Sequence, residues 1–153
     1  MAVPKFDESL VAFIDDAETP ADVESKLAQV LLDHVYVKDS FAPALLSREE
    51  EYPTALELGA HNVAIPHTEA EHTIEGSICV GVLRNAVNWR RMDDSDESCD
   101  VELVVMLALS DPHGHLEMLQ KVIAFVQDQE LVEKVLAAKT AEEVVSLAGP
   151  HLV

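Results

Sequence analysis

The hydrophobic positions of the N-terminal third recur every three or four residues, which is the period of an amphipathic helix. Thr19 and Pro20 match an N-cap followed by a proline in the first turn, and this helix is expected to end near His34. Its inward-facing residues would be Val23, Leu27, Val30 and Leu31. A second helix is expected between a cap at Asp39 and a stop before Pro53. Its inward-facing residues would be Phe41, Leu45 and Leu46.

Short apolar runs rich in β-branched residues follow in the middle of the chain. Residues 62–65 and 77–83 have the composition of strands, and residues 87–89 are consistent with a short strand turning back. Residues 92–100 are acidic and polar, so we expect a loop there. Residues 101–109 are almost all apolar, as expected of a central strand that is buried on both faces.

The C-terminal part returns to the helical period. A turn at 111–114 precedes a helix whose buried stripe would be Leu116, Leu119, Val122, Ile123 and Val126. Residues 131–136 fit another helix, and a capping box at 140–143 opens a last one. Helices that alternate with buried strands predict an α/β fold. We expect a single-domain three-layer sandwich, with a mixed, mostly parallel sheet and helices on both faces. Ligand sites in such folds lie at the carboxyl ends of strands.

The charge of the chain restricts its partners. The 153 residues are 48% apolar, which suits one domain with a substantial core. Asp and Glu number 29 against 10 Lys and Arg, a formal net charge of −19. Such a surface repels nucleic acid and anionic membranes and attracts a basic protein partner. A strongly solvated surface suited to a salt-rich cytoplasm would explain the same excess.

Targeting signals and paired cysteines are not evident. No apolar run approaches the roughly 20 residues that span a bilayer. Residues 1–7 lack the basic region and apolar stretch of a signal peptide. We therefore expect a cytoplasmic protein without direct membrane insertion. Cys79 and Cys99 are too few and too isolated for a disulfide or zinc framework, and we expect free buried thiols.

Two histidines stand at the ends of predicted strands. His67 comes just after the strand at 62–65, and His115 opens the helix that follows the strand at 101–109. A neutral imidazole has one nitrogen free to attack an electrophile. If the two strands are neighbours, the two rings can approach one another. A purely structural role is the alternative for a lone histidine at a strand end.

Arg48 and a helix start complete a possible anion site. The planar guanidinium matches the oxygens of a phosphoryl group. Unpaired N–H groups at the helix start near His115 also favour an anion. Together with His67, these groups predict a phosphoryl site. The alternative for Arg48 is a surface ion pair with one of three following residues, Glu49, Glu50 and Glu51. The chain has no Walker motif or kinase signature, so ATP is not the expected donor.

The His and Glu clusters raise the possibility of a metal-dependent enzyme. His67 and His72 are separated by a segment with two glutamates, and His113 lies two residues before His115. Neither cluster matches the H-E-x-x-H pattern of zinc proteases. The H-x-E at His67 lacks the downstream P-C-x-x-C of zinc deaminases. We therefore expect neither a metal nor another cofactor.

Several motifs together resemble a known family. The segment NVAIPHT at 62–68 is similar to the IIA component of the sugar phosphotransferase system, in the fructose–mannitol superfamily. The likeness extends to YVKDSFAPALLSRE at 36–49, to REEEYPT at 48–54, and to the apolar run followed by HLEML at 115–119. It covers roughly residues 5 to 148 and implies one type-2 EIIA domain over the whole chain. The pattern AIPHTEAEH at 64–72 and the acidic stretch 93–100 most resemble galactitol-type members.

The resemblance implies a phosphotransferase mechanism. The phosphocarrier protein HPr would donate a phosphoryl group to Nε2 of His67, which would pass it to a cysteine of the cognate IIB component. His115 would correspond to the family's second histidine, and Arg48 to the arginine that offsets the phosphoryl charge. Thr68 would orient the nucleophile, and His113 is an additional ring near the site. The membrane component IIC would participate only indirectly, by selecting the sugar.

The chain departs from the family pattern at two places. Ala55 stands where many members have glycine, and His113 is an extra histidine beside His115, so the pattern leaves open which of the two pairs with His67. Some galactitol-type members lack the second histidine, which implies a supporting role for it. Two other functions stay open: a regulatory, nitrogen-type IIA that binds partners according to its phosphorylation state, and a metal-dependent enzyme.

Overall fold

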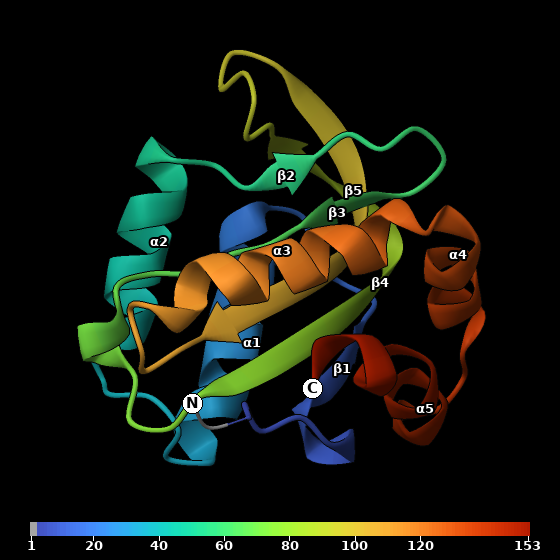
Figure 1. Ribbon diagram of the computed structural model, residues 1–153. Helices are drawn as coiled ribbons and strands as arrows, with labels where there is room; N and C mark the ends of the chain where they lie inside the picture. Colours follow the sequence, from blue (N-terminus) through green and yellow to red (C-terminus); the bar gives the residue numbers. More distant parts are fainter. Residues whose placement is uncertain (1–2) are drawn as a thin grey trace.

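A five-stranded sheet forms the middle layer of the molecule (Figure 1). The structure is a computed structural model and describes residues 3–153. The first two residues of the segment 1–7, which was interpreted above for targeting signals, lie outside the described part. The strands follow the order β1-β4-β5-β3-β2. Their bounds are Val11–Ile14 for β1, Ala55–Leu56 for β2, Asn62–Ala64 for β3, Ser77–Arg90 for β4 and Ser98–Ala108 for β5.

The sheet is mixed, but parallel pairing does not dominate it. The pairs β1–β4 and β3–β5 are parallel, whereas β4–β5 and β2–β3 are antiparallel. The expectation of a mostly parallel sheet was therefore wrong. The difference arises because a hairpin joins β4 directly to β5, so that these two long strands pair antiparallel. Residues 77–90 form one strand rather than two. A register shift between Val82 and Val87 interrupts the apolar run without ending the strand, and the chain turns back only into β5.

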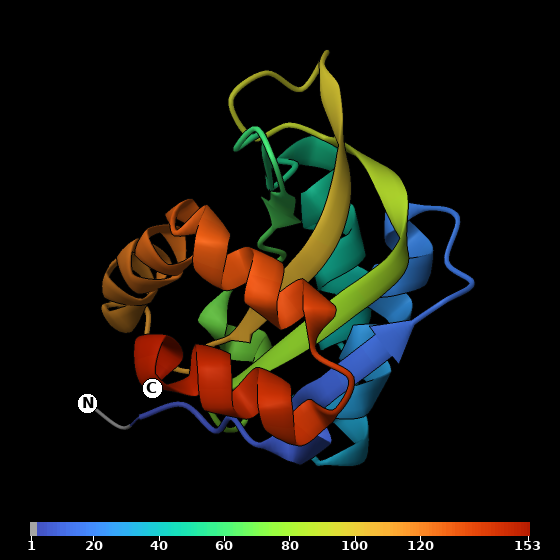
Figure 2. The same cartoon turned by 90° about the vertical axis from the view of Figure 1, so that its right-hand side faces the viewer.

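Helices cover both faces of the sheet, as predicted. Figure 2 shows the sheet between two layers, with α1 (Pro20–Asp33) and α2 (Phe41–Glu51) on one side. The other layer contains α3 (Gly114–Gln127), α4 (Gln129–Ala137) and α5 (Ala141–Leu152). Two short 3₁₀ helices complete the described elements, η1 at Glu8–Leu10 and η2 at Ala70–His72.

The central strand β5 is buried on both faces, which explains its nearly continuous apolar sequence. Val104, Met106 and Ala108 belong to the core cluster beneath α1 and α2. Leu103, Val105 and Leu107 belong to the cluster beneath α3, α4 and α5. This alternation divides the core between the two faces of the sheet, so the interpretation of residues 101–109 is confirmed.

The helix starts agree closely with the sequence. Thr19 and Asp22 form a complete capping box on α1, and the Thr140 hydroxyl accepts a hydrogen bond from the backbone N–H of Glu143 at α5. The expected cap of α2 was displaced by one residue. Ser40, not Asp39, is its N-cap, and its side chain makes no capping hydrogen bond.

The buried stripe of α3 matches the expected one only in part: Val122 and Val126 are buried, Leu119 and Ile123 are partly buried, and Met118 and Phe125 were not expected. Leu116 is 67% exposed, whereas Met118, Val122, Phe125 and Val126 are buried. Leu116 lies in the first turn of this helix, which is the next helix after β5. Its side chain lines a groove at the edge of the sheet instead of entering the core.

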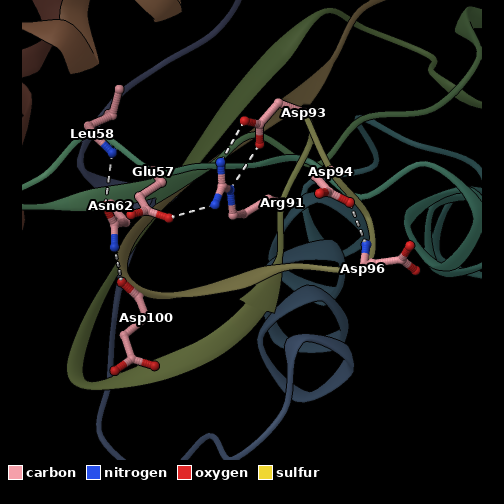
Figure 3. Close-up of polar contacts among 8 residues, drawn as sticks. All are labelled: Glu57, Leu58, Asn62, Arg91, Asp93, Asp94, Asp96 and Asp100. Carbon is pink, nitrogen blue, oxygen red and sulfur yellow. Dashed lines mark hydrogen bonds and ion pairs between the residues drawn. The ribbon is translucent and has the colours of Figure 1, made fainter.

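The acidic segment between β4 and β5 is a shorter loop than expected, because β5 already begins at Ser98. Figure 3 shows how Arg91 at its start lies between two carboxylates. One guanidinium nitrogen is 3.0 Å from Glu57 Oε2 and another is 2.6 Å from Asp93 Oδ2. Asn62 in β3 donates a hydrogen bond to the carbonyl of Asp100 at 2.9 Å. These contacts hold the acidic hairpin against β2 and β3.

Two further expectations concern membranes and thiols. Within residues 3–153, every helix is too short or too polar to cross a bilayer. Cys79 and Cys99 are buried and free, as predicted. Burial raises the pKa of the Cys79 thiol to about 12, so this group is an unreactive part of the core.

Candidate active site

The two strand-end histidines meet at one edge of the sheet. β3 and β5 are parallel neighbours, so the segments that follow them emerge on the same side. His67 continues the ladder just beyond β3 through a bridge to Leu107, and His115 lies in the first turn of α3 after β5. The ring centroids are 6.2 Å apart at an interplanar angle of 55°. The two strands are therefore neighbours, as the approach of the two histidine rings requires.

A backbone hydrogen bond fixes the tautomer of His67. Its Nδ1 lies 2.9 Å from the carbonyl oxygen of Ile65. A carbonyl oxygen only accepts hydrogen bonds, so Nδ1 carries the proton and donates it. Burial is the main cause that lowers the pKa of His67 below its ordinary value, with smaller effects of Arg48 and His115. At neutral pH, His67 is therefore a neutral imidazole whose Nε2 lone pair is free.

His115 brings an unused polar atom to the same site. Its Nε2 is buried and has no hydrogen-bond partner within residues 3–153. Desolvation first, and then the charge of Arg48, lower the pKa of its ring. A buried polar group without a partner is unfavourable, so His115 is ready to bind a group that enters beside His67.

Arg48 reaches the site from the last turn of α2. Its guanidinium is 3.2 Å from Glu69 Oε1 and stacks over the Tyr52 ring at 5.5 Å from the centroid. The ion pair that was considered as an alternative for Arg48 does form, but its partner is Glu69 and not one of the three glutamates that follow Arg48 in the sequence. Both side chains are partly exposed, so this pair contributes little stability and exchanges readily.

Glu69 is a site residue that sequence reasoning considered only as a possible metal ligand. The buried Thr68 hydroxyl donates a hydrogen bond to its Oε2 at 2.6 Å. This bond is the largest of the effects that lower the pKa of the Glu69 carboxyl, and Arg48 adds to it. Thr68 thus orients the ionised carboxylate that holds Arg48. The signal in the sequence was an acidic residue two positions after the candidate nucleophile.

These side chains line a groove of about 370 Å³. Its lining consists of Arg48, His67, Thr68, Glu69, Pro112, His115, Leu116 and Leu119. His113 is absent from this lining. It is exposed at the N-cap of α3, and its backbone N–H donates to Asp111 Oδ1 at 2.9 Å. Of the two histidines at this helix start, the structure therefore brings only His115 to His67.

The His and Glu clusters do not converge in the manner of a metal site. His72 Nδ1 and the Ser40 hydroxyl are hydrogen bonded at 2.8 Å, away from the groove lining. Across residues 3–153, no three His, Cys, Asp or Glu side chains gather closely enough to hold a metal ion.

The groove has the groups that phosphoryl transfer requires. His67 supplies a neutral nitrogen nucleophile, and Arg48 supplies positive charge and guanidinium N–H donors. Phosphoryl transfer depends mostly on in-line positioning and on charge stabilisation, with little covalent work by the protein. The geometry therefore suits attack of His67 Nε2 on a phosphorus atom.

Comparisons with known proteins point to the same chemistry. Residues 5–148 match the family model described as "Phosphoenolpyruvate-dependent sugar phosphotransferase system, EIIA 2". The chain is 31% identical over 131 residues to the galactitol-specific EIIA component of Escherichia coli K12, covering 86% of this chain and 84% of that protein.

Two solved structures share the fold. Enzyme IIA mannitol, in its complex with phosphorylated IIB mannitol from E. coli, superposes with a TM-score of 0.80 at 18% identity, covering 97% of this chain and 99% of that one. Nitrogen regulatory protein IIA-Ntr from Neisseria meningitidis superposes with a TM-score of 0.67 at 21% identity, covering 91% and 92%. Given the family match across nearly the whole chain, this protein belongs to the EIIA type 2 family of the phosphoenolpyruvate-dependent sugar phosphotransferase system, and it is a phosphocarrier that relays phosphoryl groups.

Proposed function

We propose that His67 carries the phosphoryl group on Nε2, receives it from HPr, and passes it to a cysteine of a IIB component during uptake of galactitol or a related polyol. The observation that carries this proposal is the hydrogen bond from His67 Nδ1 to the Ile65 carbonyl. This bond leaves Nε2 unprotonated in the groove that Arg48 and His115 line. The galactitol assignment rests on the relative that is 31% identical.

The transfer is an exchange of one P–N bond for another. The Nε2 lone pair of His67 forms a bond to phosphorus while the bond from phosphorus to the donor histidine breaks, and its electron pair returns to that ring. The Nδ1 proton remains on His67, and the Ile65 carbonyl stabilises the positive charge that develops on the imidazole. In the second step a IIB thiolate attacks phosphorus, and Nε2 leaves with its lone pair.

Arg48 would exchange partners during this cycle. In the free protein its guanidinium is paired with Glu69. A dianionic phosphoryl group on His67 offers a stronger, bidentate partner, and the exposed ion pair costs little to break. His115 would turn its Nε2, unpaired within residues 3–153, toward a phosphoryl oxygen.

The surface around the groove suits protein partners. Leu116 and Tyr52 are 67% and 59% exposed beside Arg48 and His67, and apolar groups at the centre of a contact exclude water from it. The net charge of −19 would accelerate encounters with basic proteins. A complex of IIA with IIB exists for the mannitol relative.

Reconstitution tests the whole proposal. The protein labelled with ¹⁵N-histidine is incubated with phosphoenolpyruvate, enzyme I and HPr, and ³¹P–¹⁵N coupling identifies the phosphorylated nitrogen. One phosphoryl group per chain on Nε2 of His67 is expected, followed by transfer to a galactitol-type IIB. Phosphate on another residue would refute the His67 assignment. Stable phosphorylation without transfer to any galactitol, fructose or mannitol IIB would instead favour a regulatory role.

The two histidines at the start of α3 should differ in importance. His115→Ala removes a groove-lining ring and is expected to slow phosphoryl transfer from HPr by about 10-fold or more. His113→Ala alters an exposed ring outside the groove lining and is expected to leave the rate within about twofold. Stopped-flow or quench-flow measurement of both variants compares them, and equal losses would contradict the assignment.

Arg48 should matter for transfer but not for folding. Arg48→Ala removes the partly exposed pair with Glu69 and the stacking on Tyr52, both at the surface, so the unfolding temperature is expected to stay within a few degrees. The rate of transfer should fall by about 100-fold, because the phosphoryl charge loses its guanidinium. Arg48→Lys keeps the charge without the bidentate fork and should fall between the two. Unchanged kinetics of Arg48→Ala would contradict this role.

A further inference from the structure

The residue next to Arg48, Glu49, is buried, and its carboxylate accepts hydrogen bonds from several donors. Glu49 is 7% exposed, and its Oε1 accepts bonds from the Thr54 hydroxyl at 2.7 Å and from Trp89 Nε1 at 2.6 Å. The Thr54 backbone N–H adds a third bond at 3.3 Å. One carboxylate thereby ties the end of α2 to the segment before β2 and to β4.

Thr54 continues this connection to the nucleophile. The backbone N–H of Ile65 points at both oxygen atoms of Thr54, 3.3 Å from the carbonyl and 3.2 Å from the hydroxyl. The carbonyl on the other side of Ile65 accepts the Nδ1 proton of His67 at 2.9 Å. Hydrogen bonds from Glu49 to Thr54, from Thr54 to the Ile65 N–H and from the Ile65 carbonyl to His67, joined by the backbone of Ile65, therefore connect Glu49 to His67.

The same carboxylate also sets the position of Arg48. Arg48 and Glu49 are consecutive residues in the last turn of α2, so anchoring Glu49 fixes where the arginine leaves the helix. The other contacts of Arg48, to Glu69 and Tyr52, lie at the surface and hold it loosely. The relative placement of Arg48 and His67 thus depends on Glu49 more than on any direct contact between the two.

Stability alone does not account for a carboxylate at this position. Removing a charge from water is costly, and an apolar side chain of similar volume would often serve the core equally well. A buried polar group that is held by several hydrogen bonds does supply one well-defined geometry. Glu49 bonds to three donors at once, all on Oε1, and two of the bonded atoms belong to the residue that contacts Ile65.

We propose that Glu49 is a positioning residue for phosphoryl transfer, which acts through Thr54 and Ile65 to hold His67 in the Nδ1–H tautomer and through α2 to hold Arg48 beside it. This inference rests on the proposed function of His67. Glu49 does not touch the phosphoryl group. Its contribution is to keep Nε2 as the free nitrogen and to keep the guanidinium within reach.

Two substitutions separate geometry from charge. Glu49→Gln keeps an oxygen that accepts the same donors, whereas Glu49→Leu removes every acceptor at similar volume. Glu50→Leu is the matched control, because the Glu50 side chain is exposed on the same helical turn. Should Glu49→Leu fail to fold, Thr54→Val removes the hydroxyl link while keeping the side-chain shape.

The tautomer of His67 is read first, by ¹⁵N NMR of the unphosphorylated protein. Wild type, Glu49→Gln and Glu50→Leu should show a protonated Nδ1, and Glu49→Leu or Thr54→Val should show a rise of the Nε2–H tautomer. This measurement needs no phosphoryl donor. It therefore tests the positioning role of Glu49 independently of phosphorylation. Failure of HPr to phosphorylate His67 would refute the proposed function but not this role.

Transfer kinetics give the second readout. We expect Glu49→Leu to lower kcat for transfer from HPr by at least tenfold with the KM for HPr within threefold, and Glu49→Gln to stay within threefold on both. A folded Glu49→Leu variant, or Thr54→Val in its place, with the wild-type tautomer and the wild-type kcat would overturn the proposal. If Glu49→Gln lost as much kcat as Glu49→Leu, the explanation by hydrogen-bond geometry would be overturned.

Discussion

His67→Gln is expected to lose phosphoryl acceptance from HPr by at least about 1,000-fold, to the background of the assay, because no other atom replaces the attacking nitrogen. The amide of glutamine can still bond to the Ile65 carbonyl that now accepts Nδ1–H, so the fold should be retained. Gel-based detection of the radiolabelled protein after incubation with phosphoenolpyruvate, enzyme I and HPr measures the loss. Undiminished labelling would contradict the assignment of His67.

The matched control is His151→Gln. His151 lies at the C-terminal end of α5 and stacks on Phe125 with ring centroids 6.0 Å apart, so it contributes nothing to the groove. Its replacement should leave labelling unchanged. A loss of labelling in both variants would indicate a general effect of histidine replacement.

The pH dependence of acceptance gives independent support. Only the neutral imidazole can attack, and burial lowers the pKa of His67 below its ordinary value of 6.5. Acceptance should therefore persist at pH 6.5 and decline only in more acidic solution, as the ring becomes protonated. A decline centred above pH 6.5 that followed the protonation of His67 in NMR would show that the ring is more basic than its burial implies.

The elements that could be predicted well from the sequence are those with long periodic patterns. The helices 20–33, 114–127 and 141–152 and the buried strand of residues 101–109 show either the helical period or continuous apolarity. The strand β1 was missed, because four residues directly after a 3₁₀ turn carry too little periodicity. The strand β2 has only two residues and exists because β3 offers it a partner.

The candidate site could be predicted as far as it depends on strand ends. His67, His115 and Arg48 were found from residue type, position and resemblance, and all three line one groove. The pairing of Arg48 with Glu69 and the link from Glu49 to Trp89 were not predictable. These contacts join residues 21 and 40 positions apart, and no local pattern encodes such distances.

One departure from the family pattern has a simple structural explanation. Ala55, where many members have glycine, is fully buried in β2 and pairs with Ala64 of β3. Its ordinary strand conformation needs no glycine, and a methyl group fits the core there. The substitution therefore leaves the Thr54–Ile65 contact beside it intact.

Glu24→Gln is expected to stabilise the protein markedly at neutral and alkaline pH. Glu24 on α1 is 2% exposed, and its Oε2 has no hydrogen-bond partner within residues 3–153. Burial, and secondarily the charge of Glu49, raise the pKa of its carboxyl to about 9. At pH 7 the folded protein therefore holds Glu24 protonated, whereas the unfolded chain releases the proton.

The sign of the effect follows from proton linkage. Because the pKa of Glu24 is higher in the folded state than its ordinary value of 4.5, its protonation stabilises the fold fully below about pH 4.5. That stabilisation is lost progressively as the pH rises toward 9. A change of one pH unit within this range corresponds to about 1.4 kcal/mol, so roughly 2–4 kcal/mol should be lost between pH 5 and pH 8. Glutamine has no proton to release and escapes this loss.

Urea unfolding at pH 5, 6, 7 and 8 measures the free energy of unfolding of wild type and Glu24→Gln. The difference between them should grow with pH, with the variant the more stable at pH 8. Glu18→Gln is the matched control, because it makes the same change at an exposed position just before α1, and its difference from wild type should stay nearly constant. If the free energies of unfolding of Glu24→Gln and wild type changed with pH in parallel, Glu24 would ionise in the folded protein as easily as in the unfolded chain. Water or a cation would then have to reach its carboxyl group.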